Sequence, residues 1–120
     1  MINSYKELIV WQKSFALTKI VYTITKTFPR EEAYGLTLQI RRCTVSIPSN
    51  IAEGFSRRSR KEYLQFLKIA LGSATELEVQ LLLSSELGYL KKNEFMEAND
   101  LLIEVLKILS ATIHKIKQEI

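Results

Sequence analysis

Four stretches of the chain carry apolar residues at intervals of three and four, which is the spacing of a helix with one buried face. They cover about residues 5–27, 31–54, 60–87 and 93–117. No stretch alternates apolar and polar residues as paired strands do, and the short connections favour antiparallel neighbours. The pattern therefore predicts an all-α fold, an antiparallel up-down-up-down four-helix bundle.

Two of these stretches begin with the spacing of a capping box. In this motif a serine hydroxyl accepts the amide of the third helical residue, whose carboxylate returns to the serine amide. Ser4 with Glu7 and Ser59 with Glu62 both have this spacing. We expect the first helix to begin directly after Ser4 and the third directly after Ser59.

The other helix limits rest on charge and on turn-forming residues. Glu31 and Glu32 suit the positive end of a helix dipole, so the second helix is expected to begin beside them. Asn93 is the expected cap of the fourth helix. Gly54 and Gly88 are the expected stops of the second and third helices.

The second helix contains a proline in its interior. Its apolar stripe keeps the same phase from Ile47 to Ile51, on both sides of Pro48. Proline has no amide to donate to the carbonyl of Thr44, and its ring presses on the preceding turn. We therefore expect a helix that is kinked at Pro48 but not ended there. Nearby polar side chains are expected to bond the loosened backbone groups, namely those of Ser46, Ser49 and Asn50.

The composition fits one globular domain over residues 1–120. Of these residues 47% are hydrophobic and 25% charged, and no apolar run reaches the about 18 residues that a membrane span needs. We expect a cytoplasmic protein with no membrane contact. Cys43 is the single cysteine and stands in an apolar pattern, so a buried thiol is expected.

Motifs for catalysis are missing from the sequence. His114 is the only histidine, and no glutamate stands three residues before it as in the metal sites of helical bundles. No glycine-rich phosphate loop and no serine elbow occurs. The sequence therefore favours a non-enzymatic protein without a cofactor or metal.

Residues 41–62 hold the whole positive excess of the chain. The formal net charge is +4, and this segment contributes six cations against Glu53 and Glu62, so the remaining charges cancel. Because arginine forks suit phosphate, these cations predict a surface that contacts RNA or another nucleic acid. The candidate binding residues are Arg41, Arg42, Arg57, Arg58, Arg60 and Lys61.

A second hypothesis uses the same residues differently. If Arg41 and Arg42 pair with Glu76 or Glu78 of a neighbouring helix, little charge is left for phosphate. The protein would then be a structural or protein-binding scaffold with no nucleic-acid role. Salt-dependent binding of nucleic acid separates the two hypotheses.

Some apolar residues lie off the main stripes. A single buried stripe does not need them, so they predict burial against another copy and hence a homo-oligomer. They are Leu38, Val45 and Ala52 in the second helix, and Leu64, Leu71 and Leu82 in the third.

Longer strings of the sequence carry a family resemblance. These strings are LIVWQKSFALTKIVY, FPREEAYGLTLQIRR, VSIPSNIAEGFSRRSRKEYLQFLKIALGSATELE and LGYL. They resemble the 23S ribosomal RNA intervening-sequence protein family, often called four helix bundle proteins. The resemblance implies a bacterial antiparallel four-helix bundle that assembles as a homopentamer. The sequence is also similar to pentameric accessory proteins of diversity-generating retroelements, which implies a nucleic-acid or protein partner.

Overall fold

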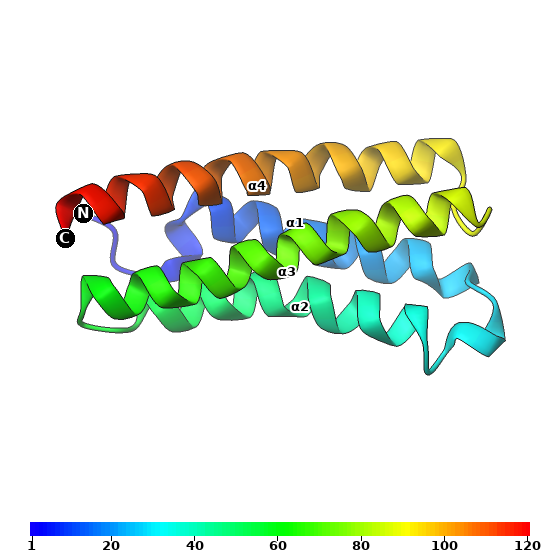
Figure 1. Cartoon of the computed structure of the whole chain (residues 1–120), viewed down its shortest axis with the longest axis horizontal. Coiled ribbons are helices and arrows are strands. Elements are labelled where there is room, and N and C mark those ends of the chain that lie inside the picture. Colours follow the sequence, from blue (N-terminus) through cyan, green and yellow to red (C-terminus); the bar gives the residue numbers. More distant parts are fainter.

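The computed structural model describes all 120 residues and confirms an all-α four-helix bundle, 45 × 24 × 21 Å in extent. Figure 1 shows that each helix runs opposite to the one before it. Both termini and the α2–α3 turn lie at one end of the bundle (Figure 1). The helices are α1 (Ile9–Ile24), α2 (Leu36–Phe55), α3 (Arg60–Glu86) and α4 (Lys92–Glu119).

One apolar core joins the four helices. α1 and α3 each pack against both α2 and α4. Leu17, Ile47, Leu77 and Leu109, one from each helix, are completely buried. Burial of each such side chain contributes roughly 1.5–3 kcal/mol, so the helical stripes supply the main stabilisation of the fold.

The first helix begins later than the sequence predicts. Ser4 and Glu7 do form a capping box, in which the Ser4 amide donates to Glu7 Oε2 over 2.8 Å. However, the box caps only a 3-10 turn over Tyr5–Glu7, because Leu8 is extended at ψ 126° and α1 starts at Ile9. With this break, the Tyr5 ring meets the edge of Trp11 at 5.0 Å between centroids.

The second helix also begins later than expected, at Leu36. Glu31 and Glu32 lie in a 3-10 turn over Arg30–Glu32. Glu32 still serves the helix N-terminus, because its Oε1 accepts the Leu36 amide over 3.1 Å. Its Oε2 accepts the Tyr89 hydroxyl over 3.0 Å, and this hydrogen bond raises the pKa of Tyr89. The carboxylate therefore ties the start of α2 to the connection after α3.

Ser59 and Gly88 limit α3 as the sequence predicts, although only half of the Ser59 capping box forms, because the Glu62 carboxylate faces Arg57 and does not return to the Ser59 amide. The Glu62 amide donates to Ser59 Oγ over 3.3 Å at the start. At the end Gly88 takes φ 80°, and the Tyr89 amide donates to the Ser84 carbonyl over 2.9 Å. This is a Schellman ending, which favours glycine because of its positive φ.

The expected cap of α4 is wrong. Lys91 is the N-cap residue, and Asn93 lies inside the helix. The Lys91 amide donates to Glu94 Oε1 over 2.9 Å, so a glutamate in the first turn satisfies the cap backbone. This arrangement also places negative charge at the positive end of the helix dipole.

Helix α2 continues through Pro48, and residues 50–53 are helical as predicted. The carbonyl of Thr44, which proline leaves without its usual amide, lies 3.1 Å from the Thr18 hydroxyl of α1, whose single hydrogen is shared with the Ser14 carbonyl at 2.9 Å. Of the expected partners within α2, Asn50 does bond a backbone group near the proline, since its Nδ2 donates to the Ser46 carbonyl over 2.8 Å. The neighbouring helix α1 thus offers the freed carbonyl a shared donor, and the predicted bend stays a prediction.

Polar contacts cross the middle of the bundle between α2 and α3. The Ser46 and Ser73 hydroxyls lie 2.8 Å apart. Cys43 Sγ donates to the Ser73 carbonyl over 3.0 Å, so the thiol is buried as expected and is hydrogen-bonded. Together with the contact between Thr18 and Thr44, these bonds link α1, α2 and α3 at the same height.

Candidate nucleic-acid interface

The α2–α3 turn depends on a close approach of the two helices at Gly54. A Cβ at this position would lie 2.7 Å from Phe66 Cβ and 3.0 Å from Tyr63 Cδ1. Gly54 is therefore required for packing and not as a helix stop, because α2 continues to Phe55. The Phe55 ring packs edge-on against Tyr63 at 6.2 Å between centroids. The turn that follows carries the cations of residues 57–61 to the surface.

Arg57 has three partners within its own chain. Its guanidinium lies 3.2 Å from Glu53 Oε2 and 3.7 Å from Glu62 Oε1. It also stacks over the Phe66 ring, 4.9 Å from the centroid. All three side chains of the ion pairs are exposed, so water and salt weaken these pairs and a phosphate can replace the carboxylates.

Arg60 forms an ion pair with Glu119, which brings the last turn of α4 beside the first turn of α3. Arg58 and Lys61 are exposed and form no ion pair with a carboxylate. These two cations are therefore the ones most available to a phosphate.

Two further lysines join this end of the bundle. Lys115 and Lys117 are exposed in the last turns of α4, close along the helix to Glu119. We call the resulting set the bundle-end cluster; its cations are Arg57, Arg58, Arg60, Lys61, Lys115 and Lys117. Its three carboxylates, on Glu53, Glu62 and Glu119, leave an excess of three positive charges. The sequence could have indicated these two lysines, because in an antiparallel bundle the end of the fourth helix lies beside the start of the third.

Arg41 lies elsewhere and is bound within the bundle. Its Nε donates to Thr25 Oγ1 over 3.0 Å, and an Nη donates to the Tyr22 carbonyl over 3.3 Å. The guanidinium also lies over the Tyr22 ring, 4.7 Å from the centroid. Because Tyr22 belongs to the last turn of α1, Arg41 satisfies backbone that the end of that helix leaves free.

Arg42 is exposed beside a shallow depression between α2 and α3 that Glu76 also lines. Neither Arg41 nor Arg42 forms an ion pair with Glu76 or Glu78, so the pairing expected under the scaffold hypothesis is not present. Cys43 lines the same depression. Burial, with the charge of Glu76, raises the pKa of its thiol to about 11, and the thiol stays protonated at neutral pH.

The six predicted residues therefore fall into two groups. Helix α2 rises about 21 Å between Arg41 and Phe55 at 1.5 Å per residue, which separates Arg41 and Arg42 from the turn. Arg57, Arg58, Arg60 and Lys61 lie together at the bundle end. The six residues therefore do not form the single patch that the sequence predicts. Four of them lie at the end of the bundle, and Arg41 and Arg42 lie along its side.

The remaining chemistry of the surface is sparse. His114 is exposed, and its ring Nε2 lies 3.2 Å from Gln118 Nε2. No group of three or more His, Cys, Asp or Glu side chains is arranged to hold a metal ion. None of the four helices combines the length and the apolarity needed to cross a membrane.

These features define a class, a small four-helix bundle with a basic end. Residues 6–111 match the family of 23S rRNA-intervening sequence proteins, and the chain belongs to that family. A crystal structure from Bacteroides thetaiotaomicron VPI-5482, described as a protein with unknown function from the S23 ribosomal protein family, is similar at 28% identity. The match has a TM-score of 0.79 and covers 88% of this chain and 96% of that chain. No curated protein matches the chain.

Proposed function

We propose that this chain is a non-enzymatic, self-associating protein that binds RNA through the bundle-end cluster. The observation that carries the proposal is the convergence of six cations from two segments that lie far apart in the sequence. Arg58 and Lys61 extend into solvent without a carboxylate partner. Such a surface attracts phosphate at a distance and binds it by charge-assisted hydrogen bonds.

RNA is the proposed ligand because the family is named for an intervening sequence of 23S rRNA. The cluster lies on a turn and on helix ends, and no helix or strand projects from it to enter a groove. Binding is therefore directed at backbone phosphates and is largely independent of base sequence. We place the protein in the cytoplasm, where such RNA occurs.

The proposal of self-association rests on apolar side chains that stay exposed in the single bundle. Val45 is 40% exposed and Leu82 is 54% exposed, in agreement with the surplus seen in the sequence. Leu64 and Leu71 are not surplus, because Leu64 is buried and Leu71 packs on the core. We propose five copies, on the family resemblance described above. Repetition of a weak phosphate site in one assembly raises the effective concentration of each site.

A titration of labelled single-stranded RNA tests the RNA contact. The variant Arg58→Gln with Lys61→Gln removes the two cations of the α2–α3 turn and of the first turn of α3 that have no ion pair, and it leaves the Ser59 cap of α3 in place. A matched control, Lys26→Gln with Lys92→Gln, removes the same charge from exposed positions at the opposite end of the bundle. Affinity is measured at salt concentrations from about 50 to about 200 mM, where phosphate binding changes steeply.

We expect the bundle-end variant alone to bind more weakly and with a flatter salt dependence. Each phosphate contact to single-stranded RNA contributes about 0.7 to the slope of log affinity against log salt, so two lost contacts flatten it by about 1.4. Equal slopes for wild type, variant and control would contradict the proposal. A scrambled RNA should bind as well as the original.

The second candidate function is a scaffold without an RNA role. It is favoured by the internal contacts of Arg41 and by the ion pairs of Arg57 and Arg60, which occupy half of the six predicted cations. Under this function the assembly persists, but neither wild type nor variant shows salt-dependent RNA binding. The same titration therefore decides between the two.

A further inference from the structure

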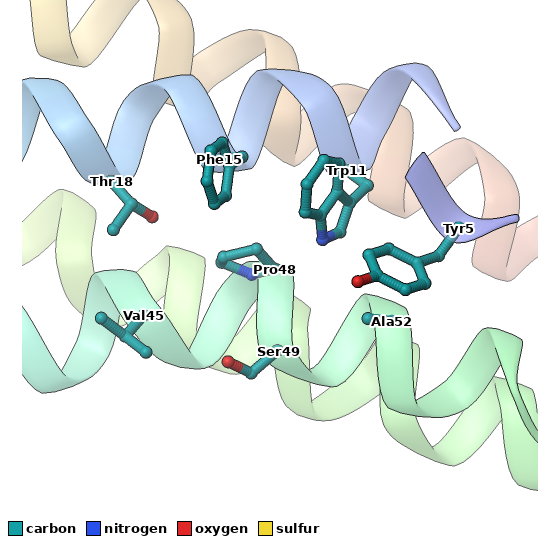
Figure 2. A pocket seen from close by; sticks show the side chains of 8 residues that line it. All are labelled: Tyr5, Trp11, Phe15, Thr18, Val45, Pro48, Ser49 and Ala52. Carbon is teal, nitrogen blue, oxygen red and sulfur yellow. The ribbon is translucent and has the colours of Figure 1, made fainter. Parts of the chain in front are cut away.

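The outer side of α1 and α2 is hollowed and apolar. A cavity of about 310 Å³ opens there, with five hydrophobic residues among the eight that line it and no charged side chain. Figure 2 shows Trp11 and Phe15 of α1 facing Val45, Pro48 and Ala52 of α2 across this hollow. The two aromatic rings stack at 4.8 Å, and Phe15 is 45% exposed. An uncharged hollow of this kind suits an apolar protein surface and not a phosphate backbone.

A second apolar surface lies on α3. Leu82 and Leu83 stand three and four residues after Val79, and Val79, Leu82 and Leu83 are 62%, 54% and 47% exposed. Seven residues before Val79, on the same side of the helix, stands Gly72, where an added Cβ would meet nothing within 4 Å. A glycine inside a helix lowers helix stability, and nothing in its own bundle requires the missing side chain. Close approach by another chain supplies a reason for it. We call Gly72, Val79, Leu82 and Leu83 the α3 ridge.

The charges around the two surfaces are opposite. Near the hollow, Lys19 lies over the Phe15 ring at 5.3 Å and Arg41 over the Tyr22 ring, while Arg42 lines the adjoining depression with Val45. Near the ridge, Glu76 and Glu86 are exposed within one turn of its apolar residues. No lysine or arginine occurs from residue 69 to residue 90. The hollow is therefore bordered by cations and the ridge by carboxylates.

We propose that the hollow between α1 and α2 of one copy receives the α3 ridge of a second copy. This assignment rests on the self-association proposed above and is independent of the RNA contact at the bundle end. The two surfaces differ, so the interface is heterologous, and every copy presents both halves. Association then continues from copy to copy until a ring closes.

Single substitutions can disable one half of the interface at a time. Val45→Asp places a carboxylate in the hollow, and Val79→Asp places one on the ridge. Both positions are exposed in the single chain, so each variant keeps its fold, which the helical circular dichroism checks. Met96→Asp is the matched control, because Met96 is 48% exposed on α4 and belongs to neither surface. Each carboxylate would lose its hydration when the apolar surfaces meet, and this loss opposes association.

Light scattering at high micromolar concentration gives the decisive masses. We expect wild type and Met96→Asp to be oligomers, and each valine variant alone to be a monomer of 13.9 kDa. An equimolar mixture of the two valine variants should form a dimer of twice the monomer mass and nothing larger. In this dimer the intact ridge of Val45→Asp enters the intact hollow of Val79→Asp. The remaining hollow and the remaining ridge each carry a carboxylate and do not associate.

Several results would overturn the inference. A monomeric wild type, a Val79→Asp variant that assembles normally, or a mixture that stays monomeric each excludes the proposed pairing. Loss of RNA binding by Val45→Asp with an unchanged oligomer mass would show that the hollow takes nucleic acid instead. The Arg58→Gln, Lys61→Gln variant separates this inference from the proposed RNA function. This variant should assemble normally. Its RNA affinity is measured separately, so a failure of the RNA proposal can be told from a failure of the proposed interface.

Discussion

Arg41 lies within the proline-containing helix α2, Arg58 lies in the turn that follows it, and the two arginines have different surroundings. Arg41 is half-buried, and its guanidinium donates hydrogen bonds to Thr25 Oγ1 and to the Tyr22 carbonyl, so this arginine stabilises the contact between α1 and α2. Arg58 follows the end of α2, reaches no carboxylate and is exposed. The comparison teaches that the availability of a cation depends on which backbone ends and carboxylates lie beside it, and not on the number of basic residues in a segment.

The geometry of the turn that exposes Arg58 should depend more on Gly54 than on any charge. We expect Gly54→Ala to lower the free energy of unfolding by about 2 kcal/mol, because its Cβ would press on Phe66 and force α2 and α3 apart. Urea denaturation measures the loss. Gly72→Ala is the control when both glycine changes are made in the monomeric Val79→Asp variant, since its Cβ meets nothing in the single bundle and should raise helix stability by about 1 kcal/mol. An unchanged stability for Gly54→Ala would remove the packing role of this glycine.

Arg41→Gln tests the structural half of the comparison. Loss of its charge-assisted hydrogen bonds should lower the free energy of unfolding by about 1.5 kcal/mol and leave the RNA salt slope of the bundle end unchanged. Arg58→Gln should do the reverse, with a change in stability of at most about 0.5 kcal/mol and weaker RNA binding. Denaturation and RNA titration on both variants check this. The comparison is wrong if Arg41→Gln weakens RNA binding and Arg58→Gln lowers the free energy of unfolding.

A double-mutant cycle sharpens the account of the Arg41 side of α2. Thr18→Val removes the donor to the Thr44 carbonyl and should cost about 1 kcal/mol in the free energy of unfolding. In a Pro48→Ala background the alanine amide can bond the same carbonyl, so the cost of Thr18→Val should fall towards zero. Urea denaturation of the four proteins gives the coupling. Equal costs in both backgrounds would mean that the hydroxyl does not replace the missing amide.

The smallest expected effect concerns Glu119, which competes with phosphate for Arg60. Glu119→Gln should free the guanidinium and tighten RNA binding about threefold, as an exposed ion pair contributes little. Glu104→Gln is the control, because it also removes one negative charge and one ion pair, the pair with Lys13, far from the bundle end. RNA titration at low salt compares them. Equal affinities for the two variants would show that Arg60 takes no part.

The sequence predicts the four helices and their stripes well, because each depends on residues within a few turns of one another. The Ser59 cap and the Gly88 ending are confirmed for the same reason. The start of α1 is missed, because the Ser4 motif is genuine but caps only one turn before the extended Leu8. The local pattern cannot show how far a capped turn extends.

The candidate site is predicted less well. Whether Arg41 is free depends on Thr25 and Tyr22, which only the packing of α1 on α2 brings near. The ion pair of Arg60 joins residues that lie 59 positions apart. Lys115 and Lys117 enter the cluster through topology alone. Charge in the sequence therefore indicates a basic surface, but tertiary contacts select the cations that can serve it.

The hydrogen bonds of Thr18, Thr44, Ser46 and Ser73 have a consequence for the axial register of the bundle. A core of leucines and isoleucines has nearly equivalent packings when one helix slides along another by a heptad. Such a slide would separate Ser46 from Ser73 and leave the Thr44 carbonyl unsatisfied beside Pro48. These contacts thus select one of several similar packings. Through that selection, a few hydroxyl groups in the middle of the bundle determine which charges meet at its end.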